Sequence, residues 1–391
     1  MISSLELFCG TGGLALGLQQ AGFHHCALIE WDRCSCENIN ANIAEGYETI
    51  ADWNVMQNDV REVDFRGSFQ NIDIVSGGPP CQPFSLGGKH GAYNDVRDMF
   101  PQAVRAVREL HPVAFVFENV KGLLRQSFRP YFEYILLQLQ YPFVEKATNM
   151  GWEEHKKMLE EVDASSTCVP DYRVKYQLVN AADYGVPQQR HRVVIVGFRK
   201  DIEAEWEFPN PTHSKGALLY SKWVSGAYWA KHHLSKPEVP EKEKAAVSRI
   251  MKEPPKELPW QTVRDAIFDL PKPGSQEANE VPNHEFRAGA KTYIGHSGST
   301  LDEPSKTIKA GAHGVPGGEN MVVLDDGSQR YYTVRESARI QTFPDEYKFY
   351  GSWTESMRQI GNAVPVRLAR IIGDSVMRVL REGRKNTDDE K

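Results

Sequence analysis

Residues 2–20 read ISSLELFCGTGGLALGLQQ, and three patterns follow one another within them. The dense apolar run over 2–8 predicts a buried strand, Gly10, Gly12 and Gly13 predict a turn, and the apolar spacing over 14–20 predicts a helix. Such a turn places backbone N–H groups and a helix N-terminus where a ligand can approach closely. Glycine-rich turns also occur where tight packing alone requires them, so this stretch indicates a binding site without proving one.

Short apolar runs recur further along the chain and alternate with helical patterns. We expect strands at the runs 27–29, 72–75, 113–117 and 192–198, and helices at 99–110, 131–139, 334–341 and 365–379. Short buried strands that alternate with helices are typical of a doubly wound α/β sheet. The sequence therefore predicts an α/β fold built on a parallel or mixed sheet.

Composition excludes several classes of protein. The 391 residues are 40% hydrophobic and 25% charged, which rules out disordered, collagen-like and membrane proteins. The opening MISSLELFCG lacks the charged and apolar regions of a signal peptide, so we expect a cytoplasmic protein that does not bind membranes. Six cysteines without a paired CxxC spacing predict neither a disulfide scaffold nor a metal site.

The amino-acid composition of the chain changes near residue 203. Prolines and aromatic residues cluster there without a readable alternation of helix and strand. Residues 211–291 contain 13 Lys and Arg against 10 Asp and Glu, although the whole chain has a net charge of −6. This segment is either a second domain that faces a polyanion or an insertion with solvated charge.

Acidic and aromatic residues mark the ends of the early strands. Glu30 ends the second apolar run, about twenty residues after the glycine-rich turn, where an acid commonly binds ribose hydroxyls. Trp31 follows it and can stack on an adenine. Asp59 and Val60 repeat the pattern of an acid at a strand end. With the turn, these residues predict a nucleoside-type cofactor.

The segment GGPPCQPFS, residues 77–85, presents Cys81 between glycines and prolines that fix the backbone. This frame favours a reactive thiol over a packing role. A nucleophilic thiol needs nearby cations, which Arg190, His191 and Arg192 supply if they fold next to it. Gly87 and Gly88 continue a glycine-rich stretch suited to closing over a substrate.

Glu118 follows another buried run, at 113–117, and has two interpretations. It is either a surface acid or a buried acid with a raised pKa that shares a proton with a substrate. Arg190 and Arg192 likewise suit a phosphate or a base carbonyl, or are surface charge beside a strand.

Taken in order, these motifs resemble the cytosine-5 DNA methyltransferase family across nearly the whole chain. The resemblance is carried by LFCGTGG, Glu30-Trp31, Asp59, GGPPCQPFS, Glu118-Asn119-Val120, PQQRHR, RESARIQTFP and QIGNAVP. It implies a Rossmann-like methyltransferase fold and a DNA (cytosine-5-)-methyltransferase activity with S-adenosylmethionine as cofactor. Two departures stand out, because residues 141–171 are longer than the family's usual link and Ala363 replaces a common serine.

The resemblance also implies roles for individual residues. Cys81 would attack carbon 6 of a flipped-out cytosine, Glu118 would act at ring nitrogen 3, and Arg192 with Arg190 would contact the base and nearby backbone. The implied cofactor-binding residues are Phe8, Gly10, Gly12, Gly13, Leu14, Glu30, Trp31, Asp59, Val60, Pro80 and Asn362. The implied DNA-binding residues are Gln82, Ser85, Gly87 and Gly88.

By the same resemblance, residues 1–202 and 330–391 form the catalytic domain and residues 203–329 form a smaller target-recognition domain. The expected partner is double-stranded DNA, the expected state is a monomer, and a cognate restriction endonuclease is a genetic partner of the chain. Two alternatives stay open, a tRNA cytosine-5 methyltransferase and a non-catalytic DNA-binding regulator. The first typically carries a Cys-Phe-Thr signature that this sequence lacks, and the second usually loses the cysteine or the acid, both present here.

Overall fold

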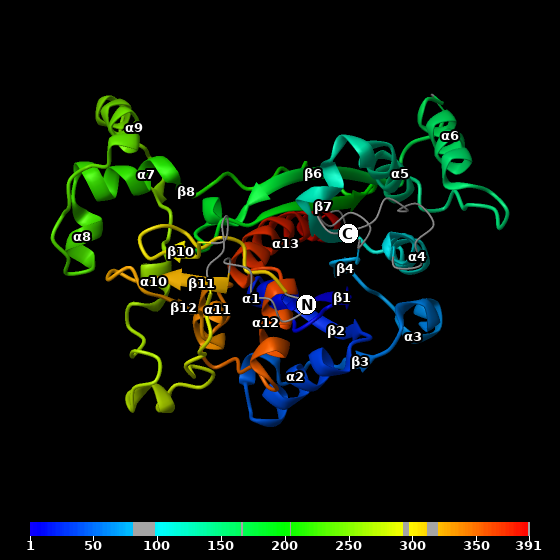
Figure 1. Ribbon diagram of the computed structural model, residues 1–391. Helices are drawn as coiled ribbons and strands as arrows, with labels where there is room; N and C mark the ends of the chain where they lie inside the picture. Colours follow the sequence, from blue (N-terminus) through cyan, green and yellow to red (C-terminus); the bar gives the residue numbers. More distant parts are fainter. Residues whose placement is uncertain (81–97, 166, 204, 292–296, 311–319, 390–391) are drawn as a thin grey trace. The chain divides into compact units, whose positions relative to one another are not determined.

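The computed structural model describes residues 1–80, 98–165, 167–203, 205–291, 297–310 and 320–389 (Figure 1). The chain divides into two compact units. The first comprises Met1–Val179, His191–Phe208 and Ile372–Lys391, and the second comprises Asn180–Arg190 and Pro209–Ile371. The predicted division at residues 203 and 329 concerns which part recognises DNA, and it stays a prediction.

A seven-stranded sheet in the order β3-β2-β1-β4-β5-β7-β6 forms the centre of the first unit. Its strands are β1 Ile2–Leu7, β2 Phe23–Glu30, β3 Val55–Gln57, β4 Ile74–Gly77, β5 Ala114–Val120, β6 Tyr172–Asn180 and β7 His191–Arg199. The pairs β1–β2, β2–β3, β1–β4 and β4–β5 are parallel, whereas β5–β7 is antiparallel. The expected doubly wound mixed sheet is confirmed.

The order of the strands in the sheet reverses direction at β1. Strands β2 and β3 lie on one side of β1, and β4 and β5 lie on the other. In sheets of this kind, ligands bind at the carboxyl ends of the strands where the order reverses. The glycine-rich turn follows β1, and the segment that leads to Cys81 follows β4. The sheet therefore brings two of the predicted motifs to the same edge.

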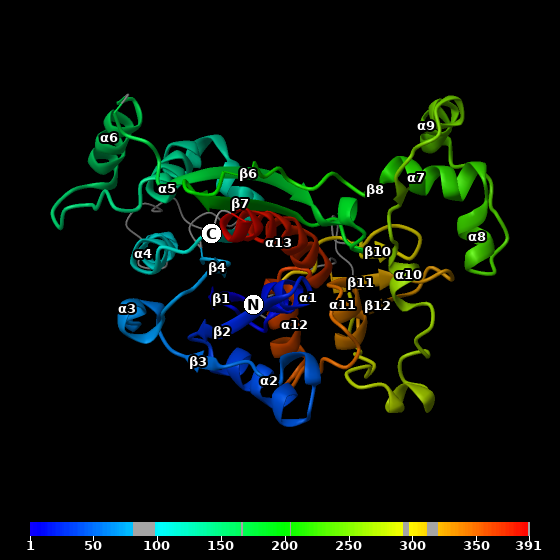
Figure 2. The same ribbon diagram turned by 180° about the vertical axis from the view of Figure 1, so that it is seen from behind.

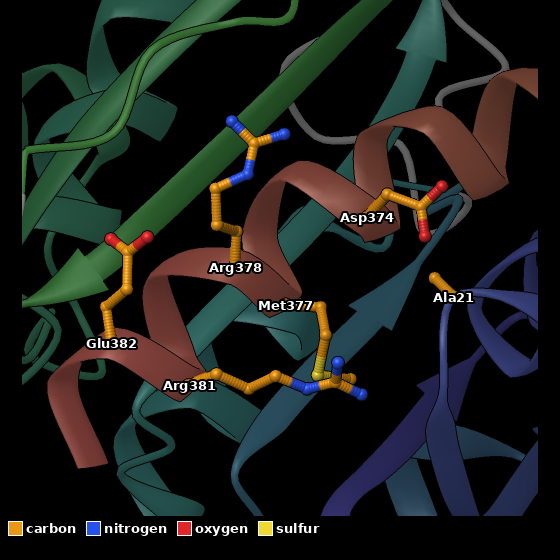
Figure 3. Close-up of a pocket in the computed structure, with 6 residues that line it drawn as sticks. All are labelled: Ala21, Asp374, Met377, Arg378, Arg381 and Glu382. Carbon is orange, nitrogen blue, oxygen red and sulfur yellow. The ribbon is translucent and has the colours of Figure 1, made fainter. Parts of the chain in front are cut away.

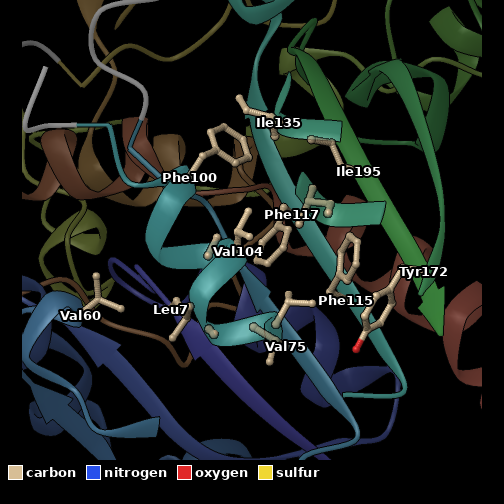
Figure 4. Close-up of a cluster of buried hydrophobic side chains, with 14 of the residues drawn as sticks. Leu7, Val60, Val75, Phe100, Val104, Phe115, Phe117, Ile135, Tyr172 and Ile195 are labelled. Carbon is tan, nitrogen blue, oxygen red and sulfur yellow. The ribbon is translucent and has the colours of Figure 1, made fainter. Parts of the chain in front are cut away.

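The helices of the first unit that precede β6 are α1 Gly13–Gln20, α2 Arg33–Ala44, α3 Phe65–Ser68, α4 Phe100–Leu110, α5 Arg129–Gln140 and α6 Trp152–Asp163. Helices α1, α2 and α4 lie directly against this sheet, whereas α3 packs on α4 and α6 packs on α5. Phe100 and Val104 of α4 pack with Phe115 and Phe117 of β5 in the main core (Figure 4). Helix α2 lies beside β2 and β3, as the view from behind also shows (Figure 2).

The last helix, α13, extends from Val366 to Asp389 and is longer than the expected helix at 365–379. It packs closely on α1, since a Cβ at Gly373 would lie 2.9 Å from both Ala21 Cβ and Leu18 Cδ2. A hollow beside this contact is lined by Ala21, Asp374, Met377, Arg378, Arg381 and Glu382 (Figure 3). None of the predicted site residues lines it.

Short elements make up the second unit. Its helices are α7 Lys215–Leu219, the π-helical turn η8 Tyr220–Val224, α8 Ala227–Lys231, α9 Glu241–Lys252, α10 Val263–Ile267, α11 Val334–Ile340 and α12 Trp353–Asn362. Its strands are β8 His213–Ser214, β9 Leu258–Pro259, β10 Ser299–Thr300, β11 Met321–Val323 and β12 Gln329–Tyr331. The aromatic residues Trp223, Tyr228, Trp229 and Trp260 gather into a buried cluster.

Single 3-10 turns connect several of these elements. They are η1 Glu48–Ile50, η2 Val60–Glu62, η5 Lys121–Leu124, η6 Gln126–Phe128, η7 Ala181–Tyr184 and η9 Glu277–Glu280. Among the described residues, no helix is both long enough and apolar enough to cross a membrane.

Candidate active site

The turn after β1 has the backbone that its glycines permit. Gly10 and Gly12 adopt φ values of +55° and +81°, in the left-handed region that favours glycine, and Phe8 shares it at +57°. A Cβ at Gly12 would lie 2.9 Å from Trp53 Cζ3, so packing also demands a glycine there. At Gly10 a Cβ would meet nothing within 4 Å. The turn is thus held tightly on one side and open at Gly10.

Glu30 ties this turn to the end of β2. Its Oε2 accepts a hydrogen bond from Gly10 N at 2.8 Å, and its Oε1 accepts from Trp31 N and Asp32 N at 2.9 Å each. Burial raises the pKa of this carboxyl. Its contact with a ribose stays a prediction, whereas its support of the turn is a role that the sequence did not indicate.

Trp31, beside Glu30, leaves 72% of its surface exposed. Its indole is therefore accessible for stacking on a flat ring, as the sequence predicts. These features fit a nucleoside-type cofactor. The open space at Gly10 admits a ligand close to the turn, the carboxylate of Glu30 is at the strand end where an acid commonly binds a ribose, and the indole of Trp31 is free to stack on a base. Gly13 and Leu14 are buried at the start of α1, directly after the glycine-rich turn.

Asp59 lies after β3, at the start of η2, as expected for an acid at a strand end. Arg61 already engages its carboxylate, through Nε at 2.9 Å and 3.0 Å and through the backbone N–H at 3.0 Å. These hydrogen bonds hold the pKa of Asp59 below its usual value. Val60 is buried in the main core, so its side chain supports the site from behind.

Glu118 and Arg192 form an ion pair at the end of β5. In the antiparallel register of β5 and β7, Arg192 lies opposite Val120, and its Nε is 2.6 Å from Glu118 Oε1. Each side chain is only 12% exposed. Burial lowers the pKa of Arg192, and the Glu118 carboxylate opposes that shift. Of the two interpretations of Glu118, the structure supports a largely buried acid, held by an arginine.

The segment that leads to Cys81 lies against this pair. A Cβ at Gly78 would be 3.5 Å from Glu118 Oε2, and Asn119 Nδ2 donates a hydrogen bond to Pro79 O at 2.9 Å. Pro80 is the last described residue of this stretch. Cys81, Gln82, Ser85, Gly87 and Gly88 lie outside the described residues, so their predicted roles stay predictions.

Arg190 differs from Arg192 in its surroundings, although the two are separated by one residue. It is 1% exposed, and its guanidinium donates to Ile308 O at 3.1 Å, Gly361 O at 2.8 Å and Ala363 O at 2.9 Å. These donors hold the backbone on both sides of Asn362, which is itself exposed at the end of α12. In the structure Arg190 thus supports the backbone around Asn362, and its predicted contact with the base stays a prediction.

Two buried glutamines extend this support within the second unit. Gln188 Nε2 donates to Gln341 Oε1 at 2.9 Å, and Gln341 Nε2 donates to Ile360 O at 2.7 Å and Ala363 O at 3.0 Å. Neither glutamine was a predicted site residue. Both stand in quoted motifs, PQQRHR and RESARIQTFP, and that position was the available signal.

No cluster of three or more His, Cys, Asp or Glu is arranged to hold a metal ion in the part of the chain that the structure describes. Cys9 and Cys36 are buried thiols whose pKa values are raised by that burial. They contribute to packing beneath the glycine-rich turn.

Comparison with known proteins identifies the class to which this fold and site belong. The family model for C-5 cytosine-specific DNA methylase matches residues 2–141 and 144–378. The chain belongs to this family and is a DNA cytosine-5 methyltransferase, which confirms the resemblance seen in the motifs.

Individual relatives agree with this result. The chain is 32% identical over 387 residues to Type II methyltransferase M.PspPI of Psychrobacter sp., covering 98% of this chain and 81% of that protein. It is 31% identical over 392 residues to Type II methyltransferase M.NgoMIV of Neisseria gonorrhoeae, covering 97% and 98%. A Spodoptera frugiperda DNMT2 mutant structure shares the fold, with a TM-score of 0.58, 15% identity and coverage of 97% and 99%.

Proposed function

We propose that this chain transfers a methyl group from S-adenosylmethionine to carbon 5 of a cytosine flipped out of double-stranded DNA, through a covalent bond to Cys81. We also propose that it is the modification enzyme of a restriction–modification system, since relatives that match nearly its whole length are Type II methyltransferases. The observation that carries the chemical proposal is the Glu118–Arg192 pair beside Gly78, three residues before Cys81.

Carbon 5 of cytosine is too weak a nucleophile to react unaided. In the proposed mechanism the Cys81 thiolate forms a bond to carbon 6 while Glu118, in its protonated form, gives its proton to ring nitrogen 3, and Glu118 takes this proton back when the bond to carbon 6 breaks. This addition moves electron density onto carbon 5. After methylation, loss of the carbon 5 proton to a base lets the bond between Sγ and carbon 6 break and restores the aromatic ring.

Arg192 keeps Glu118 in the orientation that this step requires. An arginine at 2.6 Å fixes one carboxylate oxygen and leaves the group buried without an unpaired charge. Glu118 Oε2 lies on the side of Gly78, toward the segment that enters Cys81. The acid is therefore held ready before any base arrives.

S-adenosylmethionine supplies the electrophilic methyl group when it is bound. Residues at the carboxyl ends of β1, β2 and β3 would hold it: the open turn at Gly10 and Gly12, the indole of Trp31, and the acids Glu30 and Asp59. Phe8, Gly13, Leu14, Val60, Pro80 and Asn362 complete the proposed set. For Asp59, binding would require release or sharing of the contact with Arg61.

Residues 203–329 are proposed to recognise the DNA sequence, with Gln82, Ser85, Gly87 and Gly88 against the DNA backbone. The chain would act as a monomer in the cytoplasm, and the cognate endonuclease would be its partner in genetics only.

The proposal is tested by incubating the protein with methyl-labelled S-adenosylmethionine and mixed-sequence duplex DNA, followed by base-resolution sequencing for 5-methylcytosine. We expect modified cytosines that share one short context, and none with Cys81→Ala, which should still bind the cofactor because the thiol acts on the base. Label confined to tRNA would favour the RNA enzyme. Operator binding without any turnover would favour the regulator.

A further inference from the structure

The chain on either side of residues 81–97 is joined by a hydrogen bond. Met99 N donates to Pro80 O at 3.2 Å, and the neighbouring Pro79 O accepts from Asn119 Nδ2 at 2.9 Å. Cys81 follows Pro80 directly in the sequence, so this junction holds the last described residue before the proposed nucleophile.

Asp98 connects the junction to two helices. Its Oδ1 accepts from Phe100 N at 3.1 Å, at the first residue of α4, and its Oδ2 accepts from the hydroxyl of Tyr131 in α5. Tyr131 is otherwise buried in the main core. The Asp98 carboxylate thus binds both the first residue of α4 and Tyr131 of α5, and it holds the chain in place directly before Met99.

Helix α6 holds the Tyr131 ring in place. Trp152 meets Tyr131 edge to face, with ring centroids 5.3 Å apart and planes at 84°, and it also contacts Tyr134 at 5.7 Å. The hydroxyl of Tyr134 bonds to His155 Nδ1 at 2.9 Å, and His155 Nε2 bonds to Val144 O at 3.0 Å. Burial lowers the pKa of His155, so the ring stays neutral and can use one nitrogen as donor and the other as acceptor.

Trp152 and His155 both belong to α6, within residues 141–171. We propose that Tyr131 and Asp98 are positioning residues for the Cys81 nucleophile, and that α6 supports them through Trp152. The inference rests on the proposed function of Cys81. A nucleophile works only near its attack distance, and a displacement of about 1 Å can cost about 100-fold in rate.

Tyr131→Phe tests the inference because it removes one hydroxyl and keeps the ring that Trp152 contacts. We expect kcat for DNA methylation to fall about tenfold, while KM for DNA and for S-adenosylmethionine changes less than about twofold. A merely structural role would lower thermal stability without this split between kcat and KM.

Tyr141→Phe is the matched control. Its hydroxyl donates to Asp163 Oδ1 at 2.7 Å, the side chain is buried, and it also joins α5 to the segment that contains α6. It has the same residue type and the same kind of carboxylate acceptor, but its acceptor Asp163 is at the end of α6 and not beside Met99. We expect a comparable loss of thermal stability and a kcat within about twofold of the wild-type value.

A double-mutant cycle sharpens the test. Asp98→Ala should also lower kcat, and Tyr131→Phe should add almost nothing in that background if the two residues act through their mutual contact. The inference is overturned if Tyr131→Phe keeps the wild-type kcat, or if Tyr141→Phe loses as much rate. A wild-type protein that transfers no methyl group to DNA overturns the proposed function as well, whereas an active wild type with an unaffected Tyr131→Phe overturns the positioning role alone.

Discussion

Glu118 suits the proposed reaction because its side chain is already held in one orientation, and is already largely out of water, before a substrate binds. Arg192 holds one oxygen at 2.6 Å, and the other lies on the side of Gly78. A free surface carboxylate would lose entropy and water on meeting the base, whereas this one has already done so. The catalytic value of the residue therefore depends on the strand opposite it.

Glu118→Gln tests this role. The amide keeps the shape and a hydrogen-bonding oxygen but has no acidic proton to give to ring nitrogen 3, so we expect turnover to fall by about 10²–10⁴-fold with a much smaller change in DNA affinity. Single-turnover methylation and a DNA-binding titration measure the two effects. Unchanged turnover would remove the acid from the mechanism.

A second acid, Glu6, predicts a pH dependence of stability. It is fully buried on β1, where Ser76 Oγ donates to its Oε2 at 3.0 Å, and burial raises its pKa from 4.5 to about 8. Between pH 4.5 and about 8 the unfolded chain loses this proton while the folded chain keeps it. The free energy of unfolding therefore falls as pH rises through that window, and the loss levels off above it.

Glu6→Gln should remove this dependence. Relative to wild type, the variant should gain about 2–4 kcal/mol in free energy of unfolding between pH 5 and pH 8.5. Urea unfolding at several pH values measures the difference, and His25, whose low pKa is common to both proteins, cancels in the comparison. Parallel pH profiles for the two proteins would show that Glu6 ionises normally in the fold.

At the level of elements, close backbone approach fixes the position of α12. A Cβ at Gly361 would lie 2.4 Å from Ala310 N and 2.5 Å from Lys309 C, distances that real Cβ atoms do not reach. Arg190, Gln341 and the carbonyls around Asn362 assemble at this same crossing. The exposed Asn362 is therefore presented by a tightly packed support.

Gly361→Ala should lower the free energy of unfolding by about 2 kcal/mol or more, because backbone must move to admit the methyl group. Gly151→Ala is its control, since a Cβ there meets only Glu153 Oε2, at 3.6 Å, and its backbone lies outside the left-handed region. Thermal unfolding compares the two variants. Equal melting temperatures would contradict this, because they would mean that the backbone at 309–310 moves away from the added methyl group at little cost in stability.

Predictability from sequence differed between the two units for a physical reason. The strands β1, β4 and β5 were predictable because each is a short apolar run that ends at a glycine or an acid, a local pattern. The five-residue helices α7, α8 and α10 were not, because each is too short to show periodicity. Residues of α7 and α8 are buried in one cluster with Val247 and Trp260, contacts that a local pattern does not show.

The candidate site shows the same limit at single residues. Sequence placed the acids near strand ends, and in the structure Glu30 ends β2, Asp59 follows β3 and Glu118 lies in the last three residues of β5. It could not distinguish Arg190 from Arg192, which stand two positions apart. Strand β7 begins at His191, so Arg192 reaches Glu118 from within the sheet while Arg190 stays outside it and donates to the second unit's carbonyls. Which partner each arginine finds is a property of the fold, and no local pattern encodes it.

For the whole molecule, we predict that the chain works alone. One chain carries both the proposed catalytic motifs and the proposed recognition segment, so a second copy adds no missing part. Sedimentation without DNA should give a single species near the chain mass of 44.2 kDa. A stable dimer under those conditions would contradict this.

The central claim is that Cys81 bonds covalently to the target cytosine, and trapping that bond tests it most directly. Once the methylated context is known, a duplex carrying 5-fluorocytosine at the target position is incubated with the protein and S-adenosylmethionine. Fluorine replaces the hydrogen that must leave carbon 5 as a proton, so the bond between Sγ and carbon 6 cannot break. We predict a stable protein–DNA complex whose cross-linked peptide contains Cys81. A protein that methylates ordinary DNA yet forms no such complex, or forms it at another thiol such as the exposed Cys168, would contradict the account.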